Sequence, residues 1–418
     1  MINNFNIEIF YKYLLITLAF LMPLTVFGAN LIIVVIVLAW IFSGKYQLKF
    51  QQILKSKLLI ASIIFFGIHV LGLVWTDDIR WGLNIVHKMW YFLLLLPVLF
   101  SIMKKEYIRH IIFAFLIAIA ITEVLSYLVW FEFLPPFKNA TVENPTPFMS
   151  HVSYNPILAF AIYLVCHEVF FNKNLGKLKF SFYSFFVISM SFNMFITGGR
   201  AGQVMFFAAI AILIFQFFNA EKIKSLIATI ILIPGIFFVA YNSSDLFEKR
   251  VDSALFDIIQ YEGVNLEKFN NYFYKDAIYL LANINTPVGE RISYAIYSWK
   301  IFKTSPLIGV GTGDFPVEYK KINEVYSPLM VTTNHPHNMY SLVMVQTGLL
   351  GLVSLLAIFY YQIKQSFKSP SRFIRDVGIA LPLMFLLIML SDSYLLGHYT
   401  TLMFVLFSSF LYKDFEKN

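Results

Sequence analysis

Long apolar stretches separated by short polar segments dominate the chain. A helix needs about 20 mostly apolar residues to cross the hydrocarbon core of a bilayer. Stretches of this kind recur along the whole sequence, and we predict twelve membrane-spanning helices. Their predicted ranges are 10–28, 29–43, 58–75, 85–103, 110–131, 152–171, 181–198, 201–218, 225–241, 337–362, 377–394 and 397–412. The second range is short, as expected for a tilted or partly re-entrant helix.

Composition supports this interpretation. Of the 418 residues, 59% are hydrophobic and only 13% are charged, and the mean hydropathy is +0.70. A soluble domain carries about 25% charged residues, and a protein of this length lacks the interior to bury so much apolar surface. We therefore predict an all-α integral membrane protein. The single cysteine, Cys166, excludes disulfides within the chain.

Basic residues fall mainly on one side of the predicted membrane. If the N-terminus is cytoplasmic, the cytoplasmic segments hold nineteen Lys and Arg, whereas the short outer loops hold four. This bias sets the orientation of membrane proteins and predicts that both termini are cytoplasmic. It also accounts for the net charge of +8, so we expect no nucleic-acid partner.

One outer segment differs from the other connections. Residues 242–336 are mostly polar and divide the chain into a first membrane part (1–241) and a second one (337–418). Long loops on a rigid scaffold usually carry function. Within this segment, 291–303 has the apolar spacing of an amphipathic helix, and Arg291 is expected at its beginning.

A glycine-rich run follows this helix. Gly309, Gly311 and Gly313 resemble part of the dinucleotide-binding fingerprint, but Asp314 stands where its last glycine should be. The fingerprint also requires a preceding strand and a following helix. We therefore expect a flexible turn rather than a nucleotide site.

Two histidines precede the tenth predicted helix, in the run Asn334-His335-Pro336-His337-Asn338. A metal site is not expected, because no Asp, Glu or Cys lies within ten residues. A neutral histidine can accept a proton from a hydroxyl group, although an ordinary hydrogen-bonded histidine is an equal alternative. Asp392 and His398, in the last outer turn, could orient a site residue.

Two arginines are candidate anion ligands. Arg200 lies in the turn Thr197-Gly198-Gly199-Arg200-Ala201-Gly202, where a charge in an apolar setting needs a partner. Its planar guanidinium suits phosphate oxygens, and the glycines would let an anion approach the backbone. A turn arginine that merely reaches the membrane surface is the alternative. For Arg291 alone, a solvated surface charge is the better interpretation.

Two polar groups lie inside predicted spans. His69 and Glu123 would suit a proton relay in a transporter. Two such groups are few for that role, so we favour a buried hydrogen-bonded pair or a lining contact.

The motifs together resemble one known family. His337-Asn338 followed after nine residues by Gly348 is similar to the signature of O-antigen ligases and the related polymerases. The segment 197–202 is similar to their outer arginine motif, and 291–315 resembles the stretch that precedes the histidine. The twelve-helix plan with a large loop between helices nine and ten resembles the family over the whole chain.

The resemblance implies a membrane glycosyltransferase with a GT-C-like fold in the bacterial inner membrane. Such enzymes take a glycan from an undecaprenyl diphosphate carrier on the periplasmic face, and ligases pass it to a sugar hydroxyl of lipid A-core. The family implies no nucleotide and no metal. It places His337, Arg200 and Arg291 in catalysis, with His335 and Asn338 as further substrate-binding candidates.

The same motifs leave alternatives open. An O-antigen polymerase uses the same donor but extends another lipid-linked glycan. A protein O-oligosaccharyltransferase uses a serine or threonine of a protein as acceptor. A flippase or transporter would move the lipid-linked glycan without chemistry.

Overall fold

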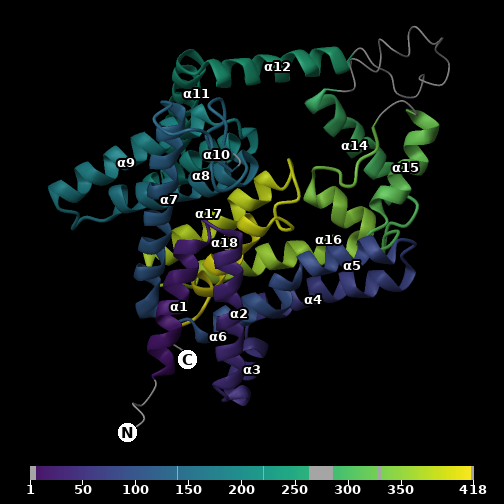
Figure 1. Cartoon of the computed structure of the whole chain (residues 1–418), viewed down its shortest axis with the longest axis horizontal. Helices are drawn as coiled ribbons and strands as arrows, with labels where there is room; N and C mark the ends of the chain where they lie inside the picture. The colour runs from purple at the N-terminus through teal and green to yellow at the C-terminus, as the bar shows by residue number, and fades with distance from the viewer. Residues whose placement is uncertain (1–5, 139, 220, 263–285, 328–330, 416–418) are drawn as a thin grey trace.

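A computed structural model describes residues 6–138, 140–219, 221–262, 286–327 and 331–415. These residues form helices and connecting segments, without strands (Figure 1). The helices are α1 (Ile7–Leu21), α2 (Val26–Phe42), α3 (Tyr46–Lys55), α4 (Lys57–Leu71), α5 (Ile79–Lys88), α6 (Leu96–Ile102), α7 (Ile108–Trp130), α8 (His151–Phe171), α9 (Lys177–Ile196), α10 (Arg200–Phe218), α11 (Lys222–Ser243), α12 (Asp245–Glu262), α14 (Pro287–Phe302), α15 (Phe315–Tyr326), α16 (Met339–Ser366), α17 (Arg372–Ile388) and α18 (His398–Leu411). The prediction of an all-α membrane protein is confirmed.

Each of the twelve predicted ranges contains a helix, but not all of these helices are long enough to cross a membrane alone. Among the described residues, eight helical runs have sufficient length and apolarity. One of them, Ile79–Ile102, joins α5 to α6 through a π-helical turn. A ninth candidate is α2, which continues into α3 after a bend of 115°. The helices α1, α17 and α18 are shorter, so the count of twelve spans stays a prediction.

The helix α3 was not predicted. Its Lys49 and Lys55 resemble the charges of a cytoplasmic loop, but Ile53 packs into the core from the opposite face. The Lys49 ammonium group turns back to the end of α2, where it donates to the Ser43 hydroxyl and lies 4.6 Å from the Trp40 ring. The basic residues of this segment therefore belong to a helix rather than to a loop.

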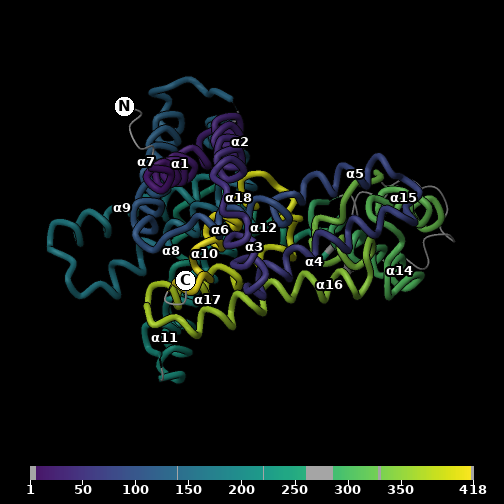
Figure 2. The backbone as a smooth tube through the Cα atoms, turned by 90° about the horizontal axis from the view of Figure 1, so that it is seen from below, coloured from purple at the N-terminus to yellow at the C-terminus, as the bar shows by residue number. Residues whose placement is uncertain are grey.

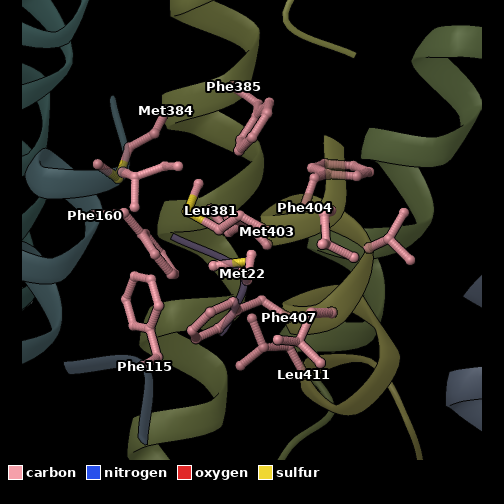
Figure 3. Packing of buried hydrophobic residues seen from close by; sticks show 14 of the residues in the cluster. Met22, Phe115, Phe160, Leu381, Met384, Phe385, Met403, Phe404, Phe407 and Leu411 are labelled. Carbon is pink, nitrogen blue, oxygen red and sulfur yellow. The ribbon is translucent and has the colours of Figure 1, made fainter. Parts of the chain in front are cut away.

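The short helix α18 forms the centre of the membrane core. All of its residues from Thr400 to Leu411 are buried, which explains why it is apolar on every side. Phe407 packs edge-on against Phe160 of α8 at 4.8 Å and Phe115 of α7 at 5.4 Å. These rings are seen together with methionine and leucine side chains in Figure 3.

The glycine-rich run is a packed connector, so the expectation of a flexible turn is wrong. Helix α16 breaks at Gly348 (φ 63°, ψ −157°), which leaves backbone groups on both sides of the break without helical partners. Residues 306–311 fill this gap. Val310 and Gly311 donate to Val345 and Gln346, and the N–H groups of Leu349 and Leu350 donate to Pro306 and Leu307.

Beyond this break, the same connector holds the turn between α4 and α5, and α4 lies beside α16 (Figure 2). The Asp314 carboxylate accepts hydrogen bonds from Thr76 Oγ1 and from the N–H groups of Asp77 and Asp78 at 2.6–3.0 Å. Asp78 in turn caps α5 through the Trp81 N–H. The loop at Asp77 and Asp78 is therefore fixed through its backbone.

The long outer segment is helical in its described parts. Helix α12 packs against α11 at one end and α14 at the other, and α14 packs on α15 and α16 (Figure 1). The predicted helix 291–303 begins earlier, at Pro287, with Thr286 as its N-cap. Whether residues 242–336 form a separate part of the molecule stays a prediction.

The two polar groups inside predicted spans have separate local partners. The His69 ring bonds to the Phe65 carbonyl in its own helix, and Glu123 accepts a hydrogen bond from Ser189. His69 and Glu123 therefore do not form a hydrogen-bonded pair with each other, and the alternative of a lining contact stays a prediction.

Replacing Gly348 with alanine is expected to destabilise the protein. The combination of φ and ψ at Gly348 is nearly exclusive to glycine and costs other residues on the order of 1–3 kcal/mol. A Cβ atom would also stand 2.4 Å from the Leu307 backbone. The apparent melting temperature of the detergent-solubilised protein measures this effect. Gly235→Ala is the control, since its Cβ would meet no atom within 4 Å, and equal melting temperatures for both variants would contradict the expectation.

Candidate active site

A histidine pair and an aspartate meet at the start of α16. The His335 and His337 rings lie 4.0 Å apart between centroids. Asp392 approaches both of them, with Oδ1 3.9 Å from His335 Nδ1 and Oδ2 3.6 Å from His337 Nδ1. His337 has a left-handed backbone (φ 48°). Such a conformation is uncommon outside glycine and is a feature of functional sites.

Backbone contacts bring Asp392 to this position. The Met339 N–H donates to the Met389 carbonyl, and the Asn338 amide donates to the Leu390 carbonyl. The turn after α17 is thereby attached to the first residues of α16. Sequence spacing could not associate Asp392 with the histidines, because this carboxylate lies more than fifty residues away from them in the chain.

Asn338 has a structural function in this arrangement. Its carbonyl oxygen caps α16 by accepting from the Ser341 N–H at 3.0 Å, while its NH₂ group holds the Leu390 carbonyl. Both ends of the amide are thus engaged within the protein. The prediction that Asn338 binds substrate is not tested by these contacts and stays a prediction.

The charges of the trio follow from their surroundings. Burial favours the protonated form of Asp392, but interactions with His337, the Ser393 N–H and His335 hold its pKa below the usual value. Burial lowers the pKa of His335, as do nearby His337 and Lys88, against the opposing effect of Asp392. At neutral pH, Asp392 is therefore ionised and His335 is neutral.

Tyr294 of α14 forms one wall of this site. Its ring stacks on the His337 ring at 6.0 Å with an angle of 20° between the planes. Burial, followed by the effect of Glu290, raises the pKa of Tyr294 to about 12, so its hydroxyl stays protonated. The sequence pattern gave no signal for this residue, because tyrosines are frequent throughout the chain.

Arg200 is the first residue of α10, but the glycines around it are not open to a ligand. A Cβ on Gly199 would stand 2.6 Å from the His151 carbonyl, and one on Gly202 would stand 2.2 Å from the Asn155 Cβ. The absence of side chains therefore lets the turn pack on α8. The expected approach of an anion to these two glycines is wrong for this reason.

The charge of Arg200 is incompletely compensated by the protein. Its Nε atom is buried without a hydrogen-bond partner in the described part of the chain, and the same holds for Oδ2 of the buried Asp257. Asp257 of α12 attracts Arg200 electrostatically, whereas Arg250 and Arg291 repel it. Buried polar atoms without partners are uncommon, and several cations held together favour an anionic ligand.

Arg250, on α12, is a member of this cluster that the sequence analysis missed. Its guanidinium would lie 3.5 Å from a Cβ built on Gly198, next to Arg200 in the turn. Helix α12 contains both acidic and basic residues, as solvated surface helices do, so its sequence pattern contains no signal for Arg250. Only the packing of α12 against α14 and the end of α9 reveals its position.

Arg291 lies on α14, the helix that also carries Tyr294. It lies in the second turn of α14, because this helix begins at Pro287 rather than at 291. The expected position of Arg291 at the beginning of the helix is therefore wrong, and Arg291 lies beyond the first turn, in which the helix dipole acts. Arg291 interacts electrostatically with Arg200 and also with Tyr394, two residues after Asp392.

The structure thus groups His335 and His337 with Asp392 and Tyr294, and it places Arg200 within electrostatic range of Arg250 and Arg291. His398 is not part of the trio, since its Nδ1 bonds to the Tyr91 hydroxyl at 2.6 Å. Residues 185–356 match the family model described as O-antigen ligase. The matched range contains the three arginines and both histidines but not Asp392. No curated protein gives a significant match.

Proposed function

Because the chain belongs to the O-antigen ligase/polymerase superfamily, we propose that it transfers a glycan from undecaprenyl diphosphate to a sugar hydroxyl of lipid A-core on the periplasmic face. The proposal rests on one observation above all. Arg291 lies within electrostatic reach of both Arg200 and the loop that holds Asp392. In this proposal the cationic cluster binds the diphosphate and His337 acts on the acceptor.

The arginines suit the leaving group of this reaction. The acceptor oxygen forms a bond to the anomeric carbon, while the bond from that carbon to the diphosphate oxygen breaks. The electron pair of the broken bond stays on the diphosphate, whose negative charge grows in the transition state. Preorganised cations at this position lower the barrier. Attack from the side opposite to the diphosphate inverts the anomeric carbon.

The histidine and the aspartate suit the acceptor. A neutral imidazole has one N–H and one lone pair. An ionised Asp392 beside Nδ1 favours the tautomer with the proton on Nδ1, which leaves the lone pair on Nε2 for the acceptor hydroxyl. His337 then receives the proton as the hydroxyl attacks, and Asp392 stabilises the resulting imidazolium. The stacked Tyr294 ring fixes the plane of the imidazole.

The acceptor distinguishes this function from its closest alternatives. A polymerase would use the same cations and the same histidine on a lipid-linked glycan acceptor, and a protein O-oligosaccharyltransferase would use them on a protein hydroxyl. A transporter is disfavoured, because His69 and Glu123 are each satisfied locally and do not form a relay.

Deletion of the gene tests the assignment. We expect the lipopolysaccharide ladder to disappear from gels while polymer accumulates on the lipid carrier, and wild-type protein to restore the ladder. A core that keeps a single added repeat would instead identify a polymerase. An unchanged lipopolysaccharide profile would contradict both and direct attention to glycoproteins, to another glycan acceptor or to transport.

Chelation is expected to leave the transfer reaction intact. The arginine cluster supplies the positive charge that a divalent ion provides in many soluble glycosyltransferases. The rate of transfer by purified protein, measured with lipid-linked donor and lipid A-core before and after EDTA treatment, tests this. A complete loss of activity that a divalent ion restores would overturn the metal-independent mechanism.

A further inference from the structure

The trio His335, His337 and Asp392 has the geometry of a transition-metal site. Their potential ligand atoms all lie within 4.8 Å of one another, and the two contacts from Asp392 to the histidine Nδ1 atoms measure 3.6 and 3.9 Å. With zinc–ligand distances of about 2.0–2.2 Å, tetrahedral ligands lie about 3.4 Å apart. The two Asp392 contacts are close to this spacing, and the two histidines would have to approach each other to complete three ligand positions.

The surroundings of the two histidine Nδ1 atoms also favour a metal site. Both are buried and lack a hydrogen-bond partner in the described part of the chain, although the rest of each ring is partly exposed. The left-handed backbone of His337 turns its ring toward that of His335. The two histidines of this His-x-His pair thus direct their Nδ1 atoms toward the carboxylate of Asp392.

We propose that this trio is an inhibitory binding site for a divalent transition-metal ion of the zinc type. The inference rests on the proposed catalytic function of His337. A metal ion takes the lone pair of Nδ1, so the single proton of the neutral imidazole must sit on Nε2. That nitrogen then has no lone pair and cannot accept the proton of the acceptor hydroxyl. Metal binding and general-base catalysis exclude each other at His337.

The chemistry of the donors selects the ion and limits its affinity. Two imidazoles and one carboxylate suit Zn²⁺, Co²⁺ or Ni²⁺, whereas Mg²⁺ and Ca²⁺ prefer oxygen ligands. The fourth position would be taken by water. Lys88 and Arg291 act electrostatically on His335 and on Tyr394 near Asp392, and their positive charges weaken cation binding. The site is therefore expected to bind metal reversibly.

Cobalt titration of the purified, tag-free, full-length protein in detergent tests the site directly. We expect d–d absorption bands that saturate at one Co²⁺ per chain and disappear when Zn²⁺ is added, but not when Mg²⁺ is added. His335→Gln and Asp392→Asn should each lose these bands. His87→Gln, which removes an exposed histidine from α5 outside the trio, should keep them.

The possible outcomes separate this inference from the proposed function. Equal cobalt binding by wild type, His335→Gln and Asp392→Asn would overturn the site, and so would the absence of bands in the wild type. Unchanged transfer by wild type saturated with Zn²⁺ would overturn inhibition. Variant-dependent cobalt binding by a protein that transfers no glycan would support the metal site while contradicting the proposed function. Gel filtration of each variant shows whether it folds.

Discussion

Replacement of His337 by glutamine is expected to lower the rate of glycan transfer by roughly 10²- to 10⁴-fold, the usual contribution of a general base. Glutamine keeps a polar side chain of similar reach but cannot accept a proton at neutral pH. The left-handed backbone at His337 and the nearby Asp392 indicate that the ring is held in one orientation. Single-turnover transfer from lipid-linked donor to lipid A-core measures the effect.

The neighbours of His337 provide the controls for this result. Asp392→Asn should slow transfer less than His337→Gln, because it removes the group that favours the active tautomer but leaves the base. His87→Gln should have no effect. If His337→Gln inserts into the membrane and transfers glycan at the wild-type rate, His337 is not the base and the proposed chemistry fails.

Much of the fold could be predicted because burial in a membrane leaves a strong pattern in sequence. Twenty apolar residues in succession have few alternatives to a spanning helix, and every predicted range contains a helix, although not all of these helices are long enough to span alone. The errors arise where helices contact protein instead of lipid. Helix α3 combines lysines with a buried Ile53, and α18 is short because neighbouring helices, rather than lipid, surround it.

The break in α16 is a second feature that could not be predicted from the sequence. Gly348 could be recognised as part of a motif, but not as a point where a helix opens. The helix opens there because residues 306–311 form hydrogen bonds with the backbone on both sides of the break. Two glycine-containing segments that are forty residues apart in sequence thus form one unit, and the flexible turn expected from Gly309, Gly311 and Gly313 is in fact rigidly packed.

The candidate site was predictable where a residue lies in a local motif. Arg200 and His337 stand beside glycines and polar residues in otherwise apolar sequence. Placing polar or charged side chains in a membrane costs free energy, so these residues are candidates for a function. Arg250 and Tyr294 have no such context, since one lies among other charges and the other is one of 24 tyrosines. Their function depends on packing between helices, which a single sequence does not contain.

The arginine cluster also has a consequence for how the site is assembled. Arg200 begins a predicted spanning helix, whereas Arg250 and Arg291 lie on the outer helices α12 and α14. Arg250 and Arg291 repel Arg200, and the attraction of Asp257 offsets this repulsion only in part. A diphosphate would relieve that repulsion, which couples donor binding to the docking of the outer helices.

Removal of one arginine is therefore expected to impair both donor binding and transfer. Arg200→Ala, Arg250→Ala and Arg291→Ala should each lower the rate by about 10²- to 10³-fold, as for other groups that stabilise charge in a transition state. Arg200→Lys should recover only part of the loss, because an ammonium lacks the planar fork that matches phosphate oxygens. Steady-state kinetics with varied donor concentration distinguish weaker binding from slower chemistry.

Lys249→Ala is the matched control for Arg250→Ala. Lys249 is the exposed neighbour of Arg250 on α12, so both variants remove one positive charge from the same helix. If net charge near the membrane surface attracts the donor, the two variants should be equally impaired. If Arg250 contacts the diphosphate, only its loss should slow transfer. Equal activity of Arg250→Ala and wild type would remove Arg250 from the site and leave the charge neutralisation to Arg200 and Arg291.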